Sequence, residues 1–187
     1  MDIKNIKADP WLMTAEACAI YSQCMFKATF EEYQQEIAEI AAKQECSIFA
    51  CRHNGQFAGI ITLEKISDDT AEIIGIAVKK EFQRCGIGKF MVHFAAQTLR
   101  VNFLTAETDD DSAGFYSHTG FLVTEFIRHF PDGDVTRYNC VLDVKNRRCK
   151  SWFSATPAPS FILPSPCPYL FFCCLLIFSF GLFYFSI

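Results

Sequence analysis

Apolar and polar positions along the first 142 residues follow patterns that predict a mixed α/β sheet. Runs of β-branched and other apolar residues predict strands over about 47–51, 57–63, 71–78, 101–106, 121–130 and 135–142. Apolar positions at helical spacing predict helices over about 29–43 and 86–99, and a shorter one over 109–119. Residues 10–28 are apolar but irregular and predict one or two short helices. The expected order is α-ββ-β-α-β-α-β-β in a single domain.

Short polar motifs mark where several of these elements begin, end or turn. The run that starts at Thr29 and reaches Glu32 has the spacing of a helix capping box. Asn54-Gly55 lies between two strand-like runs and predicts a hairpin, and Asp132-Gly133 predicts a second one. Asp109 begins a cluster of N-cap residues before the third helix, and Gly120 ends that helix.

The chain divides into three regions of different composition. All 17 basic and 21 acidic residues lie within residues 1–150. We expect a domain over 1–143, a basic and then proline-rich linker over 144–168, and an apolar tail over 169–187. The tail is long enough for a membrane-spanning helix, and the basic residues before it suit a cytoplasmic domain with a C-terminal anchor. Its Phe, Ser, Leu, Pro and Cys content, with pyrimidine-rich codons, is equally typical of translated non-coding sequence.

Charge and cysteine usage limit the classes of partner and compartment. A net charge of −4 gives no support to a nucleic-acid binder, which usually presents a basic face. The first residues contain no apolar signal segment, so we expect a cytoplasmic protein, or a tail-anchored one whose domain faces the cytosol if the tail is genuine. Ten cysteines without a CxxC pair predict reduced thiols and no metal site.

The segment with recognisable chemistry is a strand, a loop and a helix start over 71–90. Gln83-Arg84-Cys85-Gly86-Ile87-Gly88 fits the pattern Q/R-x-x-G-x-G/A at a helix N-terminus, where unpaired N–H groups and the helix dipole attract phosphate. Glycines at 86 and 88 would let a pyrophosphate approach the backbone. Gly75 interrupts the preceding strand and predicts a bulge or a close backbone approach.

Together with a later motif, this segment resembles the GNAT N-acetyltransferase superfamily. The later motif runs over 104–121 and contains Phe115-Tyr116 and then Gly120-Phe121, at the spacing usual in that family. The resemblance covers about residues 29–142. It implies a single α/β domain with a mixed, mostly antiparallel sheet flanked by helices, and acetyl-CoA as co-substrate.

The resemblance also implies roles for particular residues. The pyrophosphate of acetyl-CoA would bind the loop that consists of Gln83, Arg84, Cys85, Gly86, Ile87, Gly88 and Lys89. The pantetheine would run along the backbone of Ile76, Ala77 and Val78, with the Ile76 N–H polarising the thioester carbonyl. Tyr116 matches the family's general acid for the departing thiolate.

The sequence leaves alternatives for the general base and does not identify the acceptor. Glu72 lies among apolar neighbours that could raise its pKa, while Glu107 on the next strand and a water chain are alternatives. The expected reaction is transfer of acetyl to a primary amine in a ternary complex. The alternative is a non-catalytic acyl-CoA-binding sensor or interaction module, possibly attached to a membrane. The amine and the oligomeric state are not readable from the chain.

Overall fold

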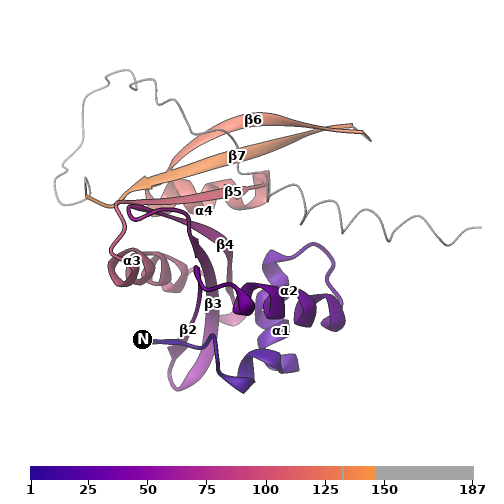
Figure 1. The fold of residues 1–187 in the computed structure, drawn as a ribbon, viewed down its shortest axis with the longest axis vertical. Helices are drawn as coiled ribbons and strands as arrows, with labels where there is room; N and C mark the ends of the chain where they lie inside the picture. Colours follow the sequence, from indigo (N-terminus) through magenta and orange to yellow (C-terminus); the bar gives the residue numbers. More distant parts are fainter. Residues whose placement is uncertain (132, 146–187) are drawn as a thin grey trace, which may run out of the picture. The chain divides into compact units, whose positions relative to one another are not determined.

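The computed structural model describes residues 1–131 and 133–145, and the described strands form one sheet in the order β1-β2-β3-β4-β5-β7-β6 (Figure 1). The strands are β1 (Asp2–Asn5), β2 (Cys46–His53), β3 (Gln56–Lys65), β4 (Thr70–Val78), β5 (Phe103–Thr108), β6 (Leu122–Phe130) and β7 (Gly133–Asp143). The helices are α1 (Ala15–Tyr21), α2 (Phe30–Ala42), α3 (Ile87–Leu99) and α4 (Asp110–Thr119), with short 3-10 helices η1 (Pro10–Met13), η2 (Ser22–Cys24) and η3 (Lys80–Phe82).

The predicted mixed, mostly antiparallel sheet flanked by helices is confirmed. Only β4 and β5 pair in parallel, and every other neighbouring pair among the described residues is antiparallel. The sequence analysis missed β1, a four-residue edge strand that pairs with β2. The irregular stretch 10–28 contains η1, α1 and η2, three short helical segments instead of one or two.

Local motifs set the element boundaries where the sequence predicted them. Thr29 and Glu32 form a capping box at the start of α2, with reciprocal side-chain and backbone hydrogen bonds. Asn54 and Gly55 both have positive φ, 52° and 80°, and connect β2 to β3 in a tight hairpin. Gly120 ends α4 in the left-handed conformation.

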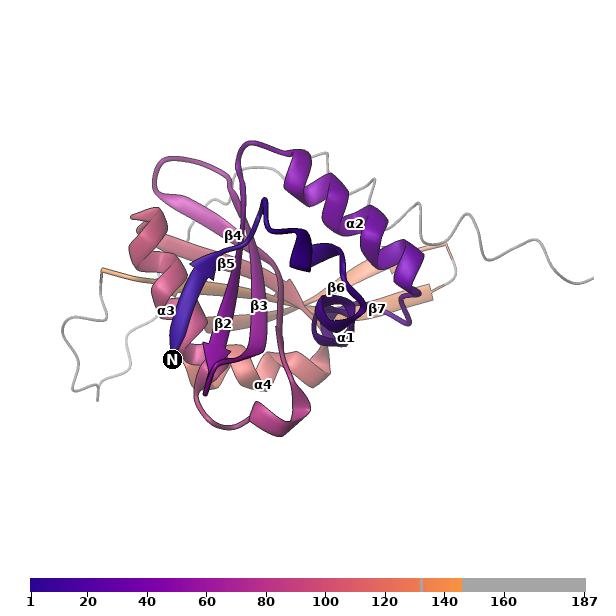
Figure 2. The same cartoon turned by 90° about the horizontal axis from the view of Figure 1, so that it is seen from below.

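The two faces of the sheet bury two separate apolar cores. On one face, α3 and α4 pack against side chains from β2 to β5 and β7, with Met91, Ile61 and Leu104 fully buried. On the other face, α1 and α2 cover β2 and β3, with Ile20, Ile37 and Ile60 fully buried. Figures 1 and 2 show α3 and the α1–α2 pair on opposite sides of the sheet. Any site that lies between β4 and β5 can therefore receive side chains from both faces.

Candidate active site

The sheet opens between β4 and β5. The two strands pair only where Thr70, Ala71 and Glu72 face Phe103, Leu104 and Thr105. Beyond Glu72 they diverge, and in Figure 1 β5 runs across the view while β2 to β4 run down it. Beyond Glu72, backbone groups on this edge of β4 have no strand partner among the described residues, so a ligand can pair with this edge.

A bulge in β4 accompanies this divergence. The pairing with β3 jumps from Thr62–Gly75 to Leu63–Ile73, which leaves Ile74 without a partner. The bulge predicted at Gly75 therefore lies one residue earlier. Gly75 is instead the site of a close approach, because a Cβ there would overlap the hydroxyl of Tyr21 and lie 2.8 Å from its ring carbon Cζ.

Backbone donors of β4 point into the gap. The N–H of Lys79 donates to the Ala58 carbonyl on β3 at 2.9 Å. Because N–H groups alternate sides along a strand, those of Val78 and Ile76 point away from β3. The Ile76 N–H faces the sulfur of Cys24, which belongs to η2. Two backbone donors, together with the Ala77 segment between them, thus line the open edge.

The loop after β4 presents further unbonded donors. Arg84 and Gly86 adopt positive φ of 61° and 80°, and none of the backbone N–H groups of Arg84, Cys85 and Gly86 donates a hydrogen bond within the described residues. Helix α3 then starts at Ile87, and the first-turn N–H groups have no partner inside a helix. Successive free N–H groups at a helix N-terminus, with the exposed Lys89 side chain beside them, form an anion-binding surface.

The two glycines of this loop have different structural roles. Gly86 needs its left-handed φ, and a Cβ there would meet nothing within 4 Å. Gly88 is helical and buried, and a Cβ there would lie 2.8 Å from the edge of the Phe115 ring. The sequence analysis assigned both to phosphate approach. The structure adds that Gly88 lets α3 pack closely against α4, which carries Tyr116.

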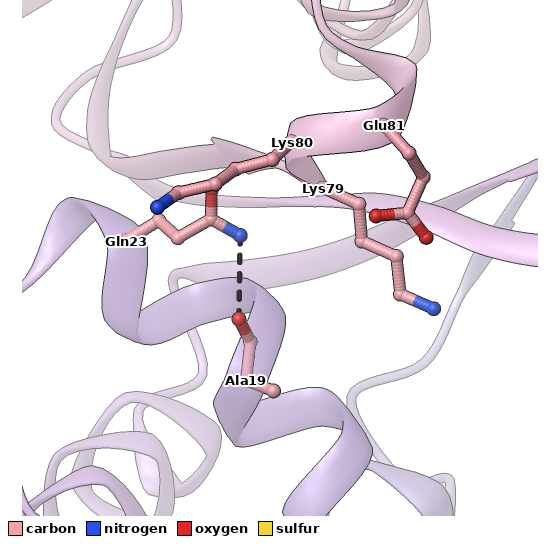
Figure 3. A pocket seen from close by; sticks show the side chains of 5 residues that line it. All are labelled: Ala19, Gln23, Lys79, Lys80 and Glu81. Atoms are coloured by element: carbon pink, nitrogen blue, oxygen red, sulfur yellow. Dashed lines mark hydrogen bonds between the residues drawn. The ribbon is translucent and has the colours of Figure 1, made fainter.

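A hollow of about 370 Å³ adjoins the start of the loop. Its lining comes from α1, η2 and the segment after β4, through Ala19, Gln23, Lys79, Lys80 and Glu81 (Figure 3). The amide of Gln83 connects these elements, since its Nε2 donates to the Val78 carbonyl at 3.0 Å and to Gln23 Oε1 at 3.3 Å. The hydrogen bonds of the Gln83 side chain therefore fix the start of the loop and do not use the backbone N–H groups that follow it.

Tyr116 lies on α4 and belongs to the core on the α3–α4 face of the sheet. Its ring packs between Phe115 and Phe121, each 5.1 Å away by centroid, and the residue is 5% exposed. Its hydroxyl forms no hydrogen bond with the described residues, yet is not among their fully buried unpartnered atoms. Burial raises the pKa of the phenol, and the neighbouring Cys140 and Cys24 raise it further. Tyr116 is therefore a protonated donor at neutral pH.

The two carboxylates on the paired strands differ in their partners. Glu107 binds Arg128 at 2.5 Å and Arg137 at 3.0 Å, so both of its oxygens are engaged. Glu72 is half-buried and forms no ion pair within the described residues. Burial raises the pKa of Glu72, and repulsion from Glu107 and Glu64 adds to the shift. Of the two, Glu72 is the one whose carboxylate is free to accept a proton.

The strands, loop and helices that form this candidate site lie largely within a segment that matches a known protein family. Residues 14–121 match the model of the Acetyltransferase (GNAT) family, which is more than half of the chain. The chain belongs to the GNAT family. A search of curated proteins finds no match for it.

Solved structures share the GNAT fold at low sequence identity. A GNAT family acetyltransferase from Elizabethkingia anophelis with acetyl-CoA bound is 19% identical, with a TM-score of 0.55, over 76% of this chain and 97% of that one. The ribosomal-protein-S18-alanine N-acetyltransferase from Escherichia coli is 19% identical, with a TM-score of 0.58, over 76% and 93%. A Bacillus subtilis acetyltransferase in complex with CoA is 19% identical, with a TM-score of 0.54, over 70% and 92%. At this identity they are similar in fold alone.

The described part of this GNAT domain contains neither a candidate metal site nor a helix suited to span a membrane. Within residues 1–131 and 133–145, no group of His, Cys, Asp and Glu side chains is arranged to hold a metal ion. No helix in the same ranges is both long and apolar enough to cross a membrane. The linker beyond Lys145 and the apolar tail over 169–187 lie outside the described residues.

Three residues near the gap were not found from the sequence. Tyr21 of α1 is fully buried and hydrogen-bonds Thr62 Oγ1 at 2.7 Å. Cys24 of η2 is exposed to solvent, yet enough protein surrounds its sulfur that burial raises the thiol pKa to about 12. Glu36 of α2 acts electrostatically on both residues. Their segments carry no motif that could have identified them.

Proposed function

We propose that this GNAT protein transfers an acetyl group from acetyl-CoA to a primary amine by direct attack in a ternary complex. The observation that carries the proposal is the gap between β4 and β5. The groups that we assign to it are the Ile76 N–H, which points away from β3 towards the Cys24 sulfur, the Tyr116 hydroxyl and the Glu72 carboxylate, and the last two have no hydrogen-bond or ion-pair partner within the described residues. These are a donor to a carbonyl, an acid and a base, which are the three groups that aminolysis of a thioester needs.

Acetyl-CoA would bind backbone donors along the open edge of β4 and in the loop that follows β4. The free N–H groups of Arg84, Cys85 and Gly86 and the start of α3 would bind its pyrophosphate. The open edge at Ile76, Ala77 and Val78 would pair with the amide groups of the pantetheine arm, as an added strand does. The E. anophelis and B. subtilis relatives, which hold acetyl-CoA and CoA, support this choice of co-substrate.

Glu72 and Tyr116 would carry out the proton transfers of the proposed reaction. Glu72 takes one proton from the ammonium of the acceptor, and its raised pKa brings it closer to that of the amine. The amine nitrogen attacks the thioester carbon, and the developing oxyanion accepts a hydrogen bond from the Ile76 N–H. When the C–S bond breaks, Tyr116 protonates the thiolate of CoA, and the second proton that the attacking nitrogen loses restores the phenol. The products are an N-acetyl amine, CoA and one released proton.

The test measures acetyl-CoA binding and amine acetylation separately. Calorimetry on the full chain gives the acetyl-CoA affinity of the wild type, of Gly86→Glu and of Gly55→Glu. Gly86 and Gly55 share a φ of +80°, and neither has an atom within 4 Å of an added Cβ, so both variants carry the same backbone strain. We expect Gly86→Glu alone to abolish binding, since only it brings a carboxylate to the pyrophosphate site.

Turnover decides between an enzyme and a binding module. We expect the wild type to release CoA and form an acetylated product with at least one member of a panel of primary amines. Binding without turnover on the whole panel would support the non-catalytic acyl-CoA sensor instead. Equal loss of acetyl-CoA binding in Gly55→Glu and Gly86→Glu would show that the loop at Gly86 is not the pyrophosphate site.

A further inference from the structure

One polar side chain interrupts the buried apolar run of β3. The residues from Phe57 to Leu63 are apolar except Thr62, which is fully buried. A buried hydroxyl costs free energy unless it is hydrogen-bonded. Thr62 Oγ1 lies 2.7 Å from the Tyr21 hydroxyl and 3.4 Å from the Gly75 carbonyl oxygen. The hydroxyl therefore connects β3 to a helix on one side and to the neighbouring strand β4 on the other.

The directions of these two hydrogen bonds follow from the available donors and acceptors. The Tyr21 hydroxyl is fully buried, and Thr62 Oγ1 is its hydrogen-bond partner within the described residues. The phenol therefore donates to Thr62, because a buried O–H without an acceptor is costly. The Thr62 hydroxyl then directs its own proton to the Gly75 carbonyl. Two hydrogen bonds thus run in series from α1 through β3 to β4.

This series ends on the peptide unit that carries the Ile76 N–H. The Gly75 carbonyl and the Ile76 N–H belong to one trans peptide, so they point in opposite directions. A carbonyl held towards Thr62 on β3 therefore turns the N–H towards the open edge of β4. The alternation along β4, in which the Lys79 N–H donates to β3 at 2.9 Å, gives the same direction.

The same peptide lies beside the bulge of β4. Pairing with β3 is regular at Thr62–Gly75 and shifts by one residue at the next position of β3, which leaves Ile74 without a partner. A bulge locally disrupts the ladder, so side-chain contacts can fix a peptide that the ladder holds less firmly. Gly75 leaves space for this contact, because a Cβ there would lie 2.8 Å from Tyr21 Cζ.

We propose that Tyr21 and Thr62 are positioning residues for acetyl transfer, which hold and polarise the Gly75–Ile76 peptide so that its N–H donates to the thioester carbonyl. The inference rests on the proposed function, in which this N–H stabilises the developing oxyanion. A hydrogen bond to an amide carbonyl strengthens the N–H of the same amide as a donor, and the bond from Tyr21 adds to this polarisation. Both residues act through the peptide and not on the substrate.

The kinetic test separates the Thr62 hydroxyl from the packing of its side chain. Thr62→Val keeps the branched shape and removes the hydroxyl, whereas Thr62→Ser keeps the hydroxyl and removes a methyl group. The full chain is assayed with acetyl-CoA and an amine that the wild type acetylates. We expect Thr62→Val to lower kcat by about tenfold or more, while KM for acetyl-CoA stays within about twofold. Thr62→Ser should retain most of the wild-type kcat.

Tyr33→Phe is the matched control for Tyr21→Phe. Both tyrosines are fully buried in the core on the α1–α2 face, but the Tyr33 hydroxyl donates to the Leu12 carbonyl of η1 at 2.5 Å. Each variant loses one buried hydrogen bond, and urea denaturation measures the resulting loss of stability. We expect only Tyr21→Phe to lower kcat. Combined with Thr62→Val, it should lower kcat little further, because the two hydroxyls act in series.

Infrared spectroscopy of bound acetyl-CoA tests the positioning role without turnover. An isotopic label at the thioester carbonyl isolates its stretching band, and a hydrogen bond from the Ile76 N–H lowers the frequency of that band. We expect the band in the wild-type complex to lie below that of free acetyl-CoA. In the Thr62→Val complex the band should lie closer to the free value, whereas Tyr33→Phe should give the wild-type band.

These measurements separate the inference from the proposed function. A shifted carbonyl band that Thr62→Val loses, without turnover of any amine, would support the positioning role and refute acetylation. Turnover with the same kcat in the wild type and Thr62→Val, or with the same band in both complexes, would overturn the positioning role and leave acetylation intact. Equal loss of kcat in Tyr21→Phe and Tyr33→Phe would overturn it too, because the effect would then follow stability. A chain that binds no acetyl-CoA would overturn both proposals.

Discussion

The hydroxyl of Tyr21 occupies the space that a side chain on Gly75 would need. Tyr21 comes from α1 and is fully buried, and its hydroxyl hydrogen-bonds Thr62 on β3 at 2.7 Å. The same Thr62 is the strand partner of Gly75 on β4. Helix α1 is therefore fixed to the sheet where β4 bulges, and η2 with Cys24 follows it directly in the chain.

Gly75→Ala should destabilise the fold through overpacking. The added Cβ would lie 2.8 Å from Tyr21 Cζ, so either the ring or the strand must move. We expect a loss of about 1–3 kcal/mol in the free energy of unfolding, measured by urea denaturation. Gly114→Ala is the control, since its Cβ would meet nothing within 4 Å on a helix. It should be neutral or stabilising by up to about 1 kcal/mol, and equal effects of the two changes would contradict the overpacking argument.

Gly88→Ala should affect turnover more than acetyl-CoA binding. Its Cβ would push against the Phe115 ring, whose centroid lies 5.1 Å from that of Tyr116. We expect kcat to fall while KM for acetyl-CoA stays within about twofold, because a misplaced acid costs rate and not ground-state affinity. Steady-state kinetics check this. A large rise in KM with unchanged kcat would show that Gly88 acts on the pyrophosphate instead.

Tyr116→Phe should remove the general acid and keep the packing. The variant retains the ring between Phe115 and Phe121 and removes only a hydroxyl that has no hydrogen bond to the part of the chain that the structure describes. We expect kcat to fall by about 10²-fold or more, with acetyl-CoA affinity unchanged. Because burial raises the pKa of the wild-type phenol above its usual value of 10, we expect no basic limb from Tyr116 up to that pH. Unchanged kcat in the variant would disprove the assignment.

Glu72→Gln should abolish the acid limb of the pH–rate profile. The wild-type rate should rise with pH as Glu72 loses its proton, at a pH above the usual value of 4.5 because burial, Glu107 and Glu64 all raise its pKa. The variant should be slow and lack this limb. If the limb persists unchanged, a water chain or another group is the base.

Glu72→Gln should also stabilise the fold near neutral pH. The folded state holds the Glu72 proton more tightly than the unfolded state, since the folded pKa is raised. As pH rises from the unfolded pKa to the folded one, the unfolded state releases its proton first, and the wild type loses stability across that window. The Tm of the variant should therefore exceed that of the wild type at pH 7 and approach it at pH 4. A lower Tm of the variant at both pH values would contradict the raised pKa.

The sequence predicted those parts of the site that depend on consecutive residues. Positive φ at Gly86 and the start of α3 at Ile87 follow from the glycine pattern, since few other residues adopt that turn. The sequence could predict that Tyr116 lies on a helix, because its motif spans that single helix and its C-cap. The sequence could not predict the ion-pair partners of Glu107, because Arg128 and Arg137 reach it from β6 and β7. Nothing local to Glu107 signals these ion pairs.

The sequence by itself determined the order of elements from α2 onwards, the hairpin turn at Asn54-Gly55, the helix caps at Thr29 and Gly120, and the glycine loop before α3. Each of these follows from backbone preferences and side-chain spacing within a few residues. Only the tertiary structure decided that Glu107 is paired while Glu72 has no ion pair within the described residues, that Gly88 leaves room for the Phe115 ring, and that Cys24 lies beside the Ile76 N–H. Burial and charge pairing depend on side chains from distant segments on both faces of the sheet, and no local pattern encodes them.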